Sequence, residues 1–121
     1  MWLVQAEDLY LRRHREFEAK HREVLRALLS NLETYLQALK SGLNPISIKG
    51  GFLHPEKHHG MAAVDTKGAR SKQPAARLYF YPDVAAEVLF LLSIGFKDTQ
   101  ETDLRACRQL VDRIRKGSSD D

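Results

Sequence analysis

Cysteine is almost absent from this sequence, with Cys107 the only one among 121 residues. A single cysteine cannot close a disulfide within the chain, which excludes a disulfide-stapled scaffold and is consistent with a reducing cytoplasm. Zinc and redox sites built on cysteine pairs are excluded as well. Cys107 falls on the apolar face of an expected helix, so we interpret it as a small buried hydrophobe rather than a nucleophile.

Long apolar runs are also missing. The longest one, residues 84–92, contains Glu87 and is much shorter than the roughly 20 residues of a membrane-spanning helix. Residues 1–8 lack the basic and apolar segments of a signal peptide. We therefore expect a cytoplasmic protein without a membrane partner.

Several catalytic motifs are absent too. Gly50-Gly51 has neither the preceding strand nor the following Lys-Ser/Thr of a phosphate-binding loop, and no Gly-x-Ser-x-Gly elbow occurs. Repeats and low-complexity tracts are not found either. We expect no small-molecule cofactor.

The residues that are present can build one domain. Hydrophobic residues make up 43% of the chain and charged residues 29%, a balance that supports a core and differs from the composition of disordered proteins. We assign residues 1–116 to a single domain and residues 117–121, Gly-Ser-Ser-Asp-Asp, to a disordered tail.

Basic residues are unevenly distributed. The formal net charge is only +3, yet residues 67–77 contain no acidic residue and four basic ones, Lys67, Arg70, Lys72 and Arg77. Such a strip indicates an anionic partner, most often nucleic acid, and Lys49 in the preceding loop is grouped with it. A solvated polar loop is the alternative interpretation.

The N-terminal third is expected to be a short strand followed by two helices. Residues 1–6 are β-prone, whereas residues 8–40 contain neither Gly nor Pro and repeat leucine at helical steps of three and four. Ser30 and Glu33 have the spacing of a capping box, so we place the boundary of a helical hairpin near Ser30. Gly42 then ends the second helix.

The rest of the chain has the pattern of strands and a final helix. Because strands and helices are segregated, we predict an α+β fold: a small, mostly antiparallel sheet with an N-terminal helical hairpin and a C-terminal helix. The expected elements are, in order, a loop over 47–60, strands over 61–66, 77–81 and 87–94 with a turn at Pro82-Asp83, and a helix from Thr102 or Asp103.

A loop with three histidines offers two kinds of chemistry. His54, Glu56, His58 and His59 lie within six residues, a composition that can hold a transition metal. Histidine also titrates near neutral pH, so the same side chains can contact RNA phosphates or transfer a proton. A polar loop without special chemistry is the third interpretation, and we expect no metal.

Two cations are expected at one end of the sheet. Arg77 opens one predicted strand and Lys97 follows the next, so antiparallel pairing brings them together. Cations held on strands can grip a phosphodiester and stabilise the charge that develops in its cleavage, although cations that merely face water are the alternative. Alternation puts Tyr79 and Tyr81 on the face of Arg77, where they either stack on RNA bases or belong to the core.

These residues carry a family resemblance. The chain resembles the RelE/ParE/HigB superfamily of small bacterial toxins, and the order of the expected elements agrees with a RelE-like fold. The segment that carries the resemblance runs from His59 to Val111 and includes Arg77-Leu-Tyr-Phe-Tyr81, Leu89-Phe-Leu-Leu-Ser-Ile-Gly95-Phe-Lys97, Gln100 and Asp103-Leu104.

The resemblance implies a ribosome-dependent mRNA endoribonuclease that inhibits translation and is neutralised by a cognate antitoxin protein. In the cleaving members, the 2′-hydroxyl attacks the neighbouring phosphate, assisted by cations and a general base on the sheet. By position, Arg77 corresponds to the strand arginine at the scissile phosphate and Lys97 to a basic residue after the last strand. His58 and His59 stand where family members place basic or imidazole groups.

The sequence departs from the cleaving members after Lys97. Those members commonly have a Tyr or His there as general base, whereas Thr99-Gln100-Glu101-Thr102 leads directly into a helix. His58, His59 and Tyr79 are the remaining candidates for the base. The alternative function is therefore a non-catalytic, protein-binding member of the same fold, either similar to the gyrase-poisoning branch or a toxin relic.

Overall fold

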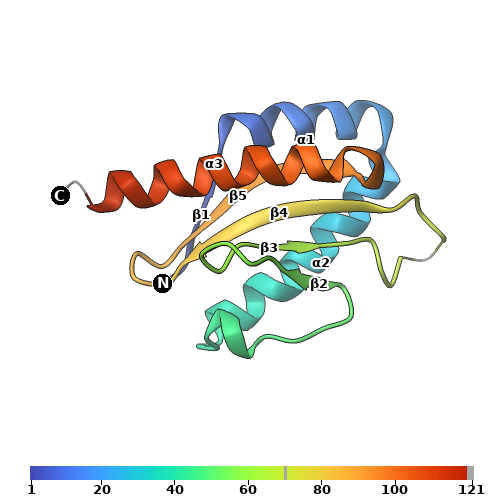
Figure 1. The fold of residues 1–121 in the computed structure, drawn as a ribbon. Coiled ribbons are helices and arrows are strands. Elements are labelled where there is room, and N and C mark those ends of the chain that lie inside the picture. Colours follow the sequence, from blue (N-terminus) through green and yellow to red (C-terminus); the bar gives the residue numbers. More distant parts are fainter. Residues whose placement is uncertain (70, 120–121) are drawn as a thin grey trace.

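The strand β4 (Ala76–Asp83) is apolar on both of its faces. Leu78 and Phe80 point to one face and Tyr79 and Tyr81 to the other, and none of the four is more than 5% exposed. A sheet that is apolar on both faces needs a helical layer on each side. The computed structural model, which describes residues 1–69 and 71–119, has this three-layer arrangement (Figure 1).

The observed elements confirm the expected order and add one short strand, β2. Helices α1 and α2 pack on the face of Leu78 and Phe80, and α3 packs on the face of Tyr79 and Tyr81. In chain order the elements are β1 (Leu3–Ala6), α1 (Asp8–Lys20), α2 (Arg22–Lys40), η1 (Pro45–Ser47), β2 (Leu53–Pro55), β3 (Ala62–Val64), β4 (Ala76–Asp83), β5 (Val88–Phe96), η2 (Lys97–Thr99) and α3 (Gln100–Ser119).

The sheet has five strands in the order β1-β5-β4-β3-β2. Strands β2 to β5 form an antiparallel meander, and β1 pairs in parallel with β5. The predicted α+β fold with a mostly antiparallel sheet is therefore confirmed. The loop expected over residues 47–60 is wrong at β2, because three residues that include Pro55 carry almost no alternation signal.

The boundary between the first two helices lies at His21 and not near Ser30. His21 has φ −139° and ψ 52°, outside the helical region. Its ring packs edge-on against Phe96 of β5, with the ring centroids 4.8 Å apart, and this tertiary contact stabilises the bend. Ser30 lies in the middle of α2, and Glu33 accepts a hydrogen bond from Gln37 of the same helix instead of closing a capping box.

The connection between β4 and β5 also differs from the prediction. Pro82 and Asp83 continue β4 and pair with β5, so the turn lies at residues 84–87. Strand β3 reaches only as far as Phe80, which leaves this end of β4 with a free edge where a proline is tolerated.

Helix α3 begins at Gln100, before the expected caps Thr102 and Asp103, and continues to Ser119, within the segment assigned to a tail. Among the described helices, none combines the length and the apolar character that a membrane crossing requires.

Candidate functional site

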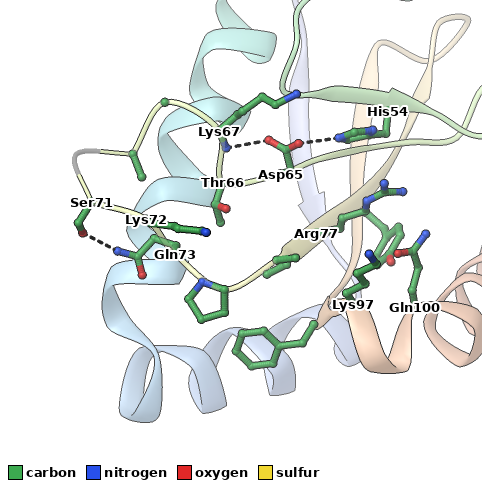
Figure 2. Close-up of a pocket in the computed structure, with 17 residues that line it drawn as sticks. His54, Asp65, Thr66, Lys67, Ser71, Lys72, Gln73, Arg77, Lys97 and Gln100 are labelled. Atoms are coloured by element: carbon green, nitrogen blue, oxygen red, sulfur yellow. Dashed lines mark hydrogen bonds and ion pairs between the residues drawn. The ribbon is translucent and has the colours of Figure 1, made fainter.

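A pocket of about 620 Å³ opens at the end of the sheet where β4 starts and β5 stops. Figure 2 shows Arg77, Lys97 and Gln100 on one wall, with Lys72 and Gln73 of the β3–β4 connection across the opening. Its basic lining residues are Lys67, Lys72, Arg77 and Lys97. Three cations of the basic segment 67–77 therefore surround one cavity together with Lys97, which strand pairing brings to it.

Arg77 and Lys97 lie at the same end of the sheet, as predicted. Arg77 is opposite Gly95 in the β4–β5 ladder, and the backbone N–H of Lys97 donates to the carbonyl of Ala75 at 3.0 Å. These backbone contacts hold both residues on the rim of the pocket. A cation on a paired strand is well positioned for a bound anion, because little backbone freedom remains to be lost on binding.

Arg77 is partly buried rather than solvent-facing. Its Nη1 atom lies 3.5 Å from Oε1 of Glu56, and the two side chains are 27% and 15% exposed. The ion pair holds the guanidinium in place, while the other N–H groups of its planar fork remain available to an oxyanion. Glu56 is the residue directly after β2, so the edge strand contributes to the position of Arg77.

His54 forms the second feature of the site. It lies on β2 and lines the pocket, and its Nε2 atom is 2.6 Å from Oδ2 of Asp65. The other carboxylate oxygen, Oδ1, accepts a hydrogen bond from the backbone N–H of Lys67 at 2.8 Å. An imidazole oriented by a fixed carboxylate is the arrangement that enzymes use for a general base or acid.

The basic loop is tied to α2 by Asn31. Its Nδ2 atom donates to the backbone carbonyls of Asp65 at 2.8 Å and Lys67 at 2.9 Å. The Nζ atom of Lys67 reaches the carbonyl of Gly51 at 3.2 Å. Asn31 therefore shapes the pocket, and nothing in the sequence distinguishes it from a solvent-facing asparagine of a helix.

Tyr79 and Tyr81 belong to the core, which is one of the two interpretations that the sequence left open, and the assignment of their rings to stacking on RNA bases is wrong. Tyr79 is 0% and Tyr81 5% exposed because α3 covers their face of the sheet. Tyr79 still lines the pocket, and its hydroxyl has no hydrogen-bond partner among the described residues. Burial, reinforced by the negative charge of Asp103, raises the pKa of Tyr79, so its hydroxyl stays protonated.

The structure does not bring the other predicted site residues to this pocket. His58 and His59 lie in the β2–β3 turn beside Asp112 of α3, and neither of them lines the pocket. Lys49 lines a different cavity, next to η1. Arg70 lies outside the described residues. Sequence reasoning missed the pairing of His54 with Asp65 and the role of Asn31. Both depend on contacts between segments that are distant along the chain.

No family model, curated protein or solved structure matches this chain.

Proposed function

We propose that this protein is an endoribonuclease that binds a stretch of RNA backbone in the pocket and cleaves it there. The observation that carries the proposal is the convergence of the four pocket cations with the His54–Asp65 pair around one opening. Asp65 is the one carboxylate among the described lining residues, and it is already hydrogen-bonded. A cavity with this charge balance favours a polyanion such as RNA.

The side chains suggest how cleavage proceeds. His54, oriented by Asp65, accepts the proton of a ribose 2′-hydroxyl, whose oxygen then attacks the adjacent phosphorus. The bond from phosphorus to the 5′-oxygen of the next nucleotide breaks, and that oxygen takes a proton from Lys97 or from water. The products are a 2′,3′-cyclic phosphate and a free 5′-hydroxyl.

The basic side chains of the pocket would stabilise the negative charge of the phosphate during cleavage. Arg77 and Lys97 are at the rim where the phosphate would lie, and they would stabilise the negative charge that builds on its non-bridging oxygens. In this assignment His54 takes the role of base for which His58, His59 and Tyr79 were the sequence candidates.

The proposal includes the cellular role that the resemblance to RelE-like toxins implies. The protein would cleave mRNA on the ribosome, inhibit translation, and be neutralised by a cognate antitoxin protein. The α+β fold, with its N-terminal helix pair and mostly antiparallel sheet, is compatible with such a toxin.

One observation favours the alternative, a non-catalytic protein-binding member of the same fold. Arg77 is engaged by Glu56, and η2 leads directly into α3 at Gln100, so no Tyr or His stands between Lys97 and that helix. If His54 does not act as a base, the pocket would bind an acidic surface without cleaving anything.

Cell-free translation followed by primer extension on the mRNA, with and without ribosomes, tests the proposal. We expect ribosome-dependent cuts that disappear in folded Arg77→Ala and persist in Arg26→Ala, which removes a cation that is 70% exposed and does not line the pocket. Intact mRNA and unaffected translation at high protein concentration would overturn the nuclease and favour the binder.

A further inference from the structure

Three side chains with metal-binding atoms meet outside the pocket. His58 and His59 come from the β2–β3 turn, and Asp112 comes from α3, 54 residues after His58. One ligand atom from each residue lies within 4.8 Å of the other two. The Nε2 atoms of His58 and His59 are 2.8 Å and 4.0 Å from Oδ1 of Asp112.

These distances suit a tetrahedral metal ion. Zinc bonds to imidazole nitrogen and carboxylate oxygen are about 2.0–2.2 Å, which separates neighbouring ligand atoms in a tetrahedron by roughly 3.3–3.5 Å. The two separations from Asp112 lie on either side of this value. Small side-chain rotations are therefore enough to place all three atoms around one ion.

The backbone of the turn explains how neighbouring histidines reach the same carboxylate. Consecutive side chains of an extended chain point to opposite sides. The backbone of His59 instead has φ +54°, in the left-handed region that residues other than glycine rarely adopt. The turn is closed by the N–H of Met61, which donates to the carbonyl of His58 at 3.0 Å. Both imidazole rings consequently lie together, with their centroids 4.7 Å apart.

We propose that His58, His59 and Asp112 form a binding site for a divalent transition metal, with Zn²⁺ the ion that two imidazoles and one carboxylate suit best. The three side chains are 23%, 44% and 58% exposed, so an ion can enter from solvent. Three protein ligands leave one tetrahedral position for water or an outside donor. The bound ion would join the β2–β3 turn to α3.

This site is independent of the proposed nuclease. None of its three residues lines the RNA pocket, and no step of the cleavage reaction uses them. Sequence reasoning weighed a metal only within residues 54–59 and expected none, because the loop contains a proline and no spaced partner was evident. The partner, Asp112, is remote along the chain.

Calorimetric titration of Zn²⁺ into the tag-free full chain tests the proposal, together with thermal unfolding with and without the ion. We expect one Zn²⁺ per chain and a higher Tm when it is bound. Cobalt, used as a spectroscopic substitute, should give the strong visible absorption of a tetrahedral site.

Variants separate the site from unspecific binding. His58→Gln and Asp112→Asn are expected to weaken Zn²⁺ binding at least about tenfold, with unchanged circular dichroism. The matched control is His14→Gln, which removes an imidazole of α1 that pairs with Glu18 and with the hydroxyl of Tyr10, outside the proposed site, and it should bind as the wild type does. If the wild type binds no Zn²⁺ at submillimolar concentration, or if both site variants bind as tightly as the wild type, the cluster is only an ion pair and the proposal is wrong.

Discussion

Asp103 of α3 lies against Gly95 of β5 so closely that no side chain fits at Gly95. A Cβ atom there would overlap the Asp103 carboxyl group and would lie 3.1 Å from Oγ1 of Thr99. Asp103 is 3% exposed and accepts a hydrogen bond from that Thr99 hydroxyl at 2.8 Å. The start of α3 thus packs on the end of β5 at Gly95, the residue that pairs with Arg77 of β4. In this chain Gly95 has a packing role beside the pocket.

Gly95→Ala is therefore expected to destabilise the fold by roughly 1–3 kcal/mol, the usual cost of overpacking a closely fitted core position. Urea unfolding would measure the change. Gly117→Ala is the control, since a Cβ at Gly117 has nothing within 4 Å, and it should not lower the urea midpoint. An unchanged midpoint for Gly95→Ala would show that α3 can shift away from β5 at little cost.

Asp103→Asn is expected to stabilise the protein at neutral pH. Burial raises the pKa of Asp103, although the hydrogen bond from Thr99 and the positive charge of Arg13 act in the opposite direction. With the folded pKa above the unfolded one, the folded state holds the proton more tightly, so this group's contribution to stability falls as pH rises between those two pKa values. Above that window the buried charge opposes folding, whereas the neutral amide does not.

The measurement for Asp103→Asn is a series of urea midpoints from mildly acidic to neutral pH. The advantage of the variant should shrink as pH falls and Asp103 becomes protonated. A variant less stable than the wild type at neutral pH would mean that Thr99 and Arg13 more than offset the burial of the charge.

Tyr79→Phe separates a ligand-binding role from a structural one. The buried hydroxyl of Tyr79 has no partner among the described residues, so its removal should leave the Tm unchanged or higher. Because the hydroxyl is buried, cleavage should also stay close to that of the wild type. A loss of about 10–100-fold would instead show that the hydroxyl donates to an RNA phosphate, since a hydrogen bond to a charged group is worth about 1.5–3 kcal/mol. Full activity in the variant would remove Tyr79 from the site.

Arg77→Ala should weaken the binding of single-stranded RNA and reduce the slope of log affinity against log salt by about 0.7, because one phosphate contact is lost. Fluorescence anisotropy at several salt concentrations measures both quantities. Arg77→Lys tests the geometry of the fork, since it keeps the charge without the bidentate donor pair. An unchanged salt slope in folded Arg77→Ala would show that Arg77 serves only its ion pair with Glu56.

His54→Gln should reduce cleavage by about 10²–10⁴-fold, the range for loss of a general base, while RNA affinity stays close to that of the wild type. Asp65→Asn should also reduce cleavage, because it leaves the imidazole in place without the charge that orients it. His58→Gln serves as the matched control and should cleave normally. Equal activity of His54→Gln and wild type would assign the base to another residue.

The helix boundary shows why some of the fold was beyond sequence reasoning. The capping-box pattern at Ser30 and Glu33 is a local signal, and it predicted a break where α2 runs on. The actual bend at His21 is stabilised by Phe96, a residue far along the chain. The contact between His21 and Phe96 exists only in the folded chain. The sequence alone therefore cannot show that this contact, and not the capping-box pattern, sets the boundary between the helices.

The sequence by itself determined the order of the main elements, the antiparallel pairing that brings Arg77 and Lys97 together, and the opposite faces of Leu78 and Tyr79. These follow from the periods of about 2 residues in strands and about 3.6 residues in helices, which are local properties of the chain. Only the tertiary structure decided that α3 covers Tyr79, that His54 meets Asp65, and that Asp112 meets the β2–β3 turn. Those contacts depend on the register of the short β2–β3 pair and on how α3 packs on the sheet, and both are set by the packing of distant segments.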